Sequence, residues 1–134
     1  MKKYSLLHIA FVLVILLAVV HFTAEAFHLY WAIWWFDNLS HFLAGFSLGF
    51  FSLSIFYEFG FFVNQLSSSK AVFASFIFVM ILGGVWEIFE YVNGLTQSTE
   101  KYSLDVIHDL LSDALGAILA FWLSPLLAGS RQRR

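Results

Sequence analysis

The chain has 134 residues, of which 60% are hydrophobic and 12% are charged. A typical soluble domain is about 45–50% apolar and about 25% charged, and a chain this short has too little interior to hide the excess. The same composition excludes intrinsic disorder. The absence of cysteine excludes disulfides and thiol catalysis, and a net charge of −2 offers no basic surface to nucleic acid. The composition predicts a single transmembrane domain, residues 1–134.

Four apolar stretches approach the roughly 20 residues that a helix needs to cross a hydrocarbon core. Backbone groups inside lipid have no water to bond, so each stretch is expected to be a helix. The predicted fold class is therefore all-α, an integral membrane four-helix bundle. Small residues in Gly45-x-x-x-Gly49 and Gly116-x-x-x-Ala120 predict faces on which helices pack closely. The expected spans are residues 6–27, 39–61, 71–92 and 105–127.

Positive charges are distributed unevenly between the two sides of these spans. Only Lys101 falls on one side, and the other six of the seven Lys and Arg residues fall on the opposite side. Because Lys/Arg-rich short loops stay in the cytoplasm, we expect an N-in/C-in orientation. Tyr30, Trp31, Trp34 and Trp35 are expected to form an aromatic belt at the outer interface. The six cytoplasmic cations are Lys2, Lys3, Lys70, Arg131, Arg133 and Arg134.

A cleaved signal peptide is the alternative interpretation of the first span. Two lysines, an apolar core and the segment Ala24-Glu25-Ala26 have the form of a signal peptide with an A-x-A cleavage site. The predicted orientation does not distinguish a retained span from a cleaved signal peptide, because the three spans that remain after cleavage would also leave the C-terminus inside. We expect the span to be retained, since polar residues on either side of the proposed cut share one helical face.

Ionisable residues gather at the ends of the spans that are expected to face outward. Of the nine acidic residues only Glu58 falls on the inner half, and of the five histidines only His8 does. Within each span the spacing i, i+3 or i, i+4 places most members on one face of a helix. The members of this layer are His21, Glu25, His28, Asp37, His41, Glu87, Glu90, Asp105, His108, Asp109 and Asp113.

This concentration of carboxylates requires a counter-charge, protonation or open hydration. An ionisable side chain costs about 2.5–3.5 kcal/mol at the centre of a spanning helix, and Lys101 is the one fixed cation on that side. Mixed carboxylates and imidazoles, including the Asp105-x-x-His108 spacing, favour a divalent metal, as in di-iron helical bundles. Ligands without sulfur indicate Zn, Mn or Fe. The candidate metal ligands are Asp37, His41, Glu87, Glu90, His108 and Asp109.

Some members of the layer also have simpler interpretations. Asp37 and Asp105 suit the N-terminal turn of a helix, where a carboxylate interacts favourably with the helix dipole. His21 and His28 suit an interfacial position or a hydrogen-bonded core position. Whether His21, Glu25 and His28 join a functional site is therefore left open.

Three motifs occur in a fixed order along the chain: Asp37-x-x-x-His41-Phe, Trp-Glu87-x-x-Glu90 and Asp109-x-x-x-Asp113-x-x-Gly-Ala. As a set they resemble the YjdF-like bacterial inner-membrane proteins, and more distantly the VanZ-like proteins, which are associated with glycopeptide resistance and the cell envelope. The resemblance covers residues 37–120. It implies a multi-pass protein of the bacterial cytoplasmic (inner) membrane in which the motif acids and histidine carry the shared pattern, and it supplies no reaction.

The leading hypothesis is a metal-dependent hydrolase or transferase acting on a lipid or cell-envelope precursor from the outer leaflet. In this hypothesis the metal activates a bound water, and Asp113 and Glu90 are the candidate catalytic residues. Its partners are membrane lipid and a lipid-linked or envelope substrate. Two alternatives stay open. A small carrier or proton relay would use the same carboxylates without metal, and a non-catalytic envelope-associated subunit would use them for packing alone.

Overall fold

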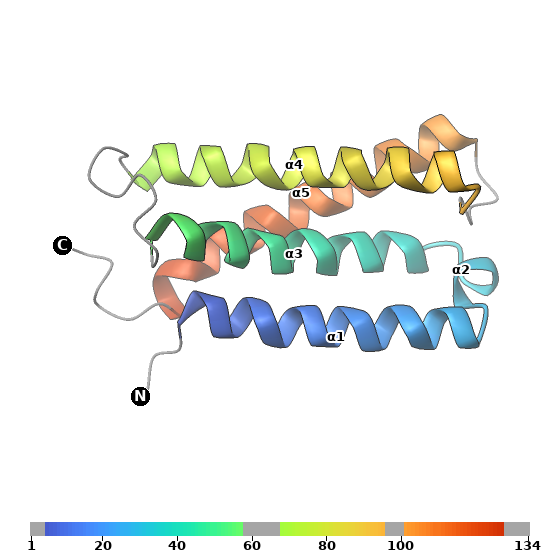
Figure 1. Ribbon diagram of the computed structural model, residues 1–134, viewed down its shortest axis with the longest axis horizontal. Coiled ribbons are helices and arrows are strands. Elements are labelled where there is room, and N and C mark those ends of the chain that lie inside the picture. Colours follow the sequence, from blue (N-terminus) through green and yellow to red (C-terminus); the bar gives the residue numbers. More distant parts are fainter. Residues whose placement is uncertain (1–4, 58–67, 96–100, 128–134) are drawn as a thin grey trace.

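The computed structural model describes residues 5–57, 68–95 and 101–127, and every secondary-structure element in these segments is a helix. The all-α class is therefore confirmed for these segments. Figure 1 shows α1, α3 and α4 running along a common direction, with α5 crossing behind them obliquely and the short helix α2 at one end. The long helices α1, α3, α4 and α5 each have the length and apolar composition to cross a membrane. The helices are α1 (Leu6–Ala26), α2 (Leu29–Ala32), α3 (Phe36–Tyr57), α4 (Ser68–Asn93) and α5 (Tyr102–Leu127).

Helix α3 is the central helix of the bundle, because it packs against α1, α4 and α5. Its closest partner is α5, and glycine on both helices permits the approach. A Cβ at Gly45 would overlap the backbone of Asp113, and a Cβ at Gly116 would overlap the backbone of α3. Further along, a Cβ at Gly49 would lie 2.7 Å from the Cβ of Ala120. These contacts confirm the predicted close-packing faces, which let helix backbones approach inside lipid.

The apolar core occupies the half of the bundle that lies away from α2. Leu6 of α1, Phe50 and Leu53 of α3, Val79 of α4 and Ala117 of α5 are fully buried there. Large apolar side chains also cover much of the outer surface of the long helices. Such a surface is suited to contact with lipid rather than with water. The polar layer predicted from the sequence is at the opposite end.

The segment between α1 and α3, which carries the tryptophans of the expected aromatic belt, is more structured than the gap between the first two predicted spans indicates. It contains helix α2, and α3 begins at Phe36 rather than near residue 39. The hydropathy pattern does not indicate this start, because the first turn of α3 contains the polar residues Asp37 and Asn38 and the apolar stretch begins after them. Asp37 and His41 are consequently one turn apart on the same helix. The expected end of the second span at residue 61, residue Glu58 and the cations at 2, 3, 131, 133 and 134 lie outside the described residues.

Candidate metal site

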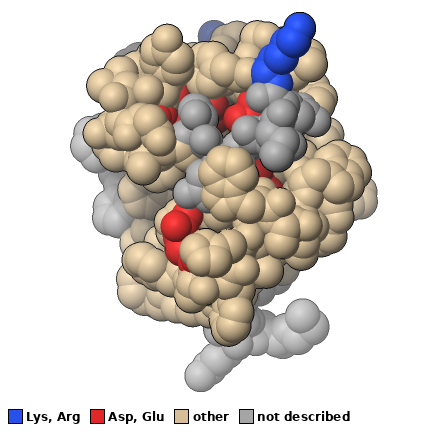
Figure 2. Space-filling model, turned by 90° about the vertical axis from the view of Figure 1, so that its right-hand side faces the viewer, with Lys and Arg blue, Asp and Glu red and all other residues tan. Residues whose placement is uncertain are grey.

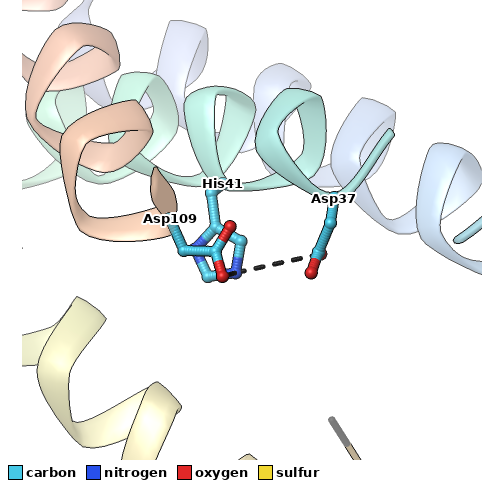
Figure 3. A group of neighbouring side chains, drawn as sticks. All are labelled: Asp37, His41 and Asp109. Atoms are coloured by element: carbon cyan, nitrogen blue, oxygen red, sulfur yellow. Dashed lines mark ion pairs between the residues drawn. The ribbon is translucent and has the colours of Figure 1, made fainter. Parts of the chain in front are cut away.

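A buried histidine, His41, lies at the centre of the polar layer. Its Nε2 atom is 3.6 Å from Oε1 of Glu87 on α4, 3.9 Å from Oδ1 of Asp37 on α3 and 4.0 Å from Oδ2 of Asp109 on α5. Figure 3 shows Asp37 and His41 projecting from the same side of α3, with Asp109 reaching the imidazole from α5. Three helices thus direct carboxylates toward one ring nitrogen.

The other ring nitrogen of His41 has a partner of its own. Nδ1 lies 3.3 Å from Oδ2 of Asp113, which is buried on α5 one turn after Asp109. Space for this carboxylate is provided by Gly83 of α4, where a Cβ would lie 2.5 Å from the same oxygen. A carboxylate accepts a hydrogen bond from a protonated Nδ1, and a neutral ring then presents the lone pair of Nε2 to the other three acids.

Two overlapping groups of side chains have the spacing required to hold a metal ion. One consists of Asp37, His41 and Asp109, and the other of His41, Glu87 and Glu90. The ligand atoms of each group lie within 4.8 Å of one another. Ligands bound to a tetrahedral ion at about 2.1 Å are roughly 3.4 Å apart, so the observed separations from Nε2 require only small movements.

Two buried carboxylate oxygens of this cluster have no hydrogen-bond partner among the described residues. They are Oε1 of Glu87 and Oδ2 of Asp109, on side chains only 3% and 1% exposed. Within that same part of the chain, the ion pairs of the cluster all involve His41, and none involves Lys or Arg. Ionised carboxylates 4.8 Å apart repel by roughly 3.5 kcal/mol at an effective dielectric constant near 20. A cation among them would remove both costs.

The structure places the remaining predicted residues outside these groups. His108, a predicted metal ligand, is exposed on α5, because consecutive helical residues differ by about 100° in direction and its neighbour Asp109 faces inward. Asp105 is half-buried in the first turn of α5. Glu25 and His28 are exposed at the end of α1. Figure 2 views this end and shows acidic side chains recessed among other residues.

A hydrogen-bonded chain beside the cluster was not anticipated from the sequence. The Tyr30 hydroxyl of α2 lies 2.8 Å from Nδ1 of His21 and 3.2 Å from Oγ of Ser40, which precedes His41. Tyr30 is buried, whereas the neighbouring tryptophans of the expected aromatic belt are exposed. Burial, reinforced by the nearby carboxylate of Asp37, raises the pKa of Tyr30 above its ordinary value. Its hydroxyl therefore stays protonated and links α1 to α3.

The cluster opens into a cavity of about 700 Å³ between α1, α3 and α4. His21, Asp37, His41, Glu90 and Asp113 line its polar end, and the remaining wall is predominantly apolar. Substrate sites commonly combine an apolar wall with a few convergent polar groups. The histidine and the three acids that line this wall are therefore accessible to a bound molecule, whereas Glu87 and Asp109 are buried and do not line the cavity.

Helices of membrane-spanning length and apolar composition define a multi-pass membrane protein. The chain belongs to the family described as "Predicted membrane protein (DUF2238)", whose model matches residues 1–129. This description gives the location of the family in the membrane and assigns it no reaction. No curated protein and no solved structure shows significant similarity to the chain.

Proposed function

We propose that the cluster around His41 binds a divalent metal ion and that the protein is a metal-dependent hydrolase or transferase acting on a lipid or cell-envelope precursor. The observation that carries this proposal is the contrast between the two nitrogens of His41. Nδ1 meets Asp113, whereas Nε2 faces oxygens of three further carboxylates. A metal ion beside Nε2 would replace repulsion between the carboxylates with coordination bonds. Oxygen and nitrogen ligands favour Zn, Mn or Fe.

The geometry supports a specific division of roles among the residues. We assign Asp37, His41, Glu87 and Asp109 as metal ligands, because an oxygen of each acid lies within 4.0 Å of Nε2 of His41. When bound, the metal would lower the pKa of a coordinated water. Glu90 and Asp113 both line the cavity, but Glu90 is half-buried whereas Asp113 is buried and contacts Nδ1 of His41, so Glu90 is the better placed of the two candidate bases. Three predicted site residues are left outside the ligand set. They are Glu90, assigned as the base, Asp113, assigned to orient His41, and His108, which is exposed.

We also propose that the protein resides in the bacterial cytoplasmic membrane with both termini inside. The support is the placement of six of the seven Lys and Arg residues, together with the resemblance to YjdF-like and VanZ-like proteins. In this orientation the cluster lies toward the outer leaflet. Precursors of the cell envelope are exposed on that side, which is why a lipid or envelope precursor is the proposed substrate.

A carrier or proton relay is a less well supported alternative, because the half of the bundle away from α2 offers few polar groups for a transport path. A transport path needs polar groups that are free to exchange partners. The buried hydroxyls of Ser47, Ser54 and Ser124 instead donate to carbonyl oxygens of their own helices, at 2.7 to 2.9 Å, whereas among the described residues of this half Ser75 alone has a buried hydroxyl without a partner. These bonds satisfy the hydroxyls inside the helix and favour a structural role.

Metal analysis of the purified full-length chain tests the proposed function. We expect bound Zn, Mn or Fe in the wild type and at least roughly tenfold less in Asp109→Asn and His41→Ala, because the first replaces a charged ligand with a neutral amide and the second removes the imidazole. Asp105→Asn is the matched control, since Asp105 lies one turn from Asp109 on the same helix and outside both ligand groups. Helix content by circular dichroism verifies folding. Equal metal in all variants, or none in the wild type after reconstitution with each metal, would overturn the proposal.

A further inference from the structure

The cavity beside the metal cluster changes character along its length. At the α2 end its wall includes His21 of α1 and Glu90 of α4. Two turns deeper the wall consists of Val14 of α1, Leu48 of α3 and Leu82 of α4. The distance between Val14 and His21 along α1 is about 10 Å at 1.5 Å per residue. The cavity thus combines a polar end with an apolar shaft directed toward the middle of the membrane-spanning region.

The cavity is open on its side, between α1 and α4. Helix α1 packs against α3, and α4 packs against α3 and α5, so α1 and α4 are separated across the cavity. Wall residues on both helices are exposed: Phe22 on α1 is 71% exposed and Val85 on α4 is 55% exposed. Because both helices span the membrane, the molecules next to this opening are lipids.

The charge at the polar end selects among lipid headgroups. Five carboxylates surround His41, and no Lys or Arg of the described segments forms an ion pair with them. Binding of one divalent ion would leave a net negative charge on the five carboxylates at this end of the cavity. An ammonium group is therefore complementary to it, whereas an anionic headgroup is repelled.

We propose that this cavity binds an ammonium-bearing phospholipid, which enters sideways between α1 and α4. Its acyl chain occupies the apolar shaft, and its headgroup lies beside His41 and Glu90. The inference names the substrate class of the site and rests on the proposed function for the reaction. Lipid binding itself depends only on the shape, polarity and charge of the cavity.

Photocrosslinking in vesicles tests this inference. Full-length protein is reconstituted with phosphatidylethanolamine that carries a diazirine on its acyl chain, and in parallel with phosphatidylglycerol that carries the same chain. We expect peptides of α1 and α4 to be labelled by the first lipid roughly fivefold more than by the second. Leu82→Trp fills the shaft and should reduce labelling by roughly fivefold or more.

Two matched controls separate the cavity from general contact with lipid. Ile81→Trp places the same side chain on an exposed position outside the cavity and should leave labelling unchanged. A second pair on α1 guards against misfolding, with Ala18→Phe inside the cavity and Val19→Phe outside it. Equal labelling within each pair, or equal labelling by the two lipids, would overturn the inference.

The metal content of the same samples separates this inference from the proposed function. Cavity-specific labelling of a protein that binds no metal would support the lipid site and overturn the metal-dependent reaction. A metal-loaded protein without cavity-specific labelling would overturn the lipid site and leave the metal site standing.

Discussion

The two ring nitrogens of His41 have different neighbours, and this difference separates the roles of the acids around the ring. Asp113 meets Nδ1 at 3.3 Å, whereas Asp37, Glu87 and Asp109 surround Nε2. In metalloproteins a histidine ligand commonly donates its second N–H to a carboxylate, which fixes the tautomer and the ring orientation. Asp113 has the position of that orienting carboxylate.

Replacement of Asp113 should weaken metal binding without abolishing it. We expect Asp113→Ala to lower metal affinity by about 10- to 100-fold, the usual effect of losing a carboxylate that orients a histidine ligand. His41→Ala should lower it further, because the ligand itself is lost. Competition with a chelator of known affinity measures both. An Asp113→Ala variant with wild-type affinity would show that Asp113 does not orient His41.

Loss of the Tyr30 hydroxyl should destabilise the α2 end. Tyr30→Phe leaves His21 and Ser40 without their shared partner, and we expect a loss of about 1–2 kcal/mol in the free energy of unfolding. Tyr91→Phe is the control, because Tyr91 is 64% exposed. Unfolding in mild detergent compares the two variants. Equal stability would contradict a structural role for this hydroxyl.

At the scale of the helices, the contact between α3 and α5 positions most of the cluster. Gly45 and Gly116 allow the two backbones to approach, and this approach brings Asp109 and Asp113 beside His41. Helix α4 then adds Glu87 from the other side. The cluster is consequently sensitive to side-chain volume at glycines that bind nothing themselves.

Alanine substitutions at Gly116 and Gly84 should differ in their effect on stability. Gly116→Ala would overlap the backbone of α3, and we expect it to destabilise the protein by about 1–3 kcal/mol and to reduce metal binding. A methyl group at Gly84 would have no atom of another described helix within 4 Å, so Gly84→Ala should be neutral or stabilising by up to about 1 kcal/mol. Thermal unfolding measures both. Similar stability of the two variants would contradict the close contact.

Helical periodicity predicted the inward face shared by Asp109 and Asp113, because residues four apart lie on one side of a helix. Periodicity did not exclude His108 from the predicted ligands, since the side of α5 that faces inward depends on which helices pack against it. It also gave no signal for the burial of Tyr30. The chain reverses at His28, which has a φ of 55°, a conformation usually indicated in sequence by glycine or asparagine.

At the scale of the molecule, the hydropathy of the sequence was sufficient to predict a membrane protein of four apolar helices. It did not identify α3 as the central helix, because helix pairing depends on contacts between distant segments. The two ends of the bundle differ: buried apolar residues fill one, and a cluster of acids around a histidine occupies the other. This asymmetry makes the acidic end the functional part of the molecule in our proposal.

X-ray absorption spectroscopy of the zinc-loaded protein tests most directly whether the helices assemble a metal site around His41. We expect one imidazole nitrogen and several carboxylate oxygens at about 2.0–2.2 Å from the metal. The imidazole signal should disappear in His41→Ala and persist in His108→Ala. A shell of water oxygens alone, unchanged in His41→Ala, would contradict the proposed site.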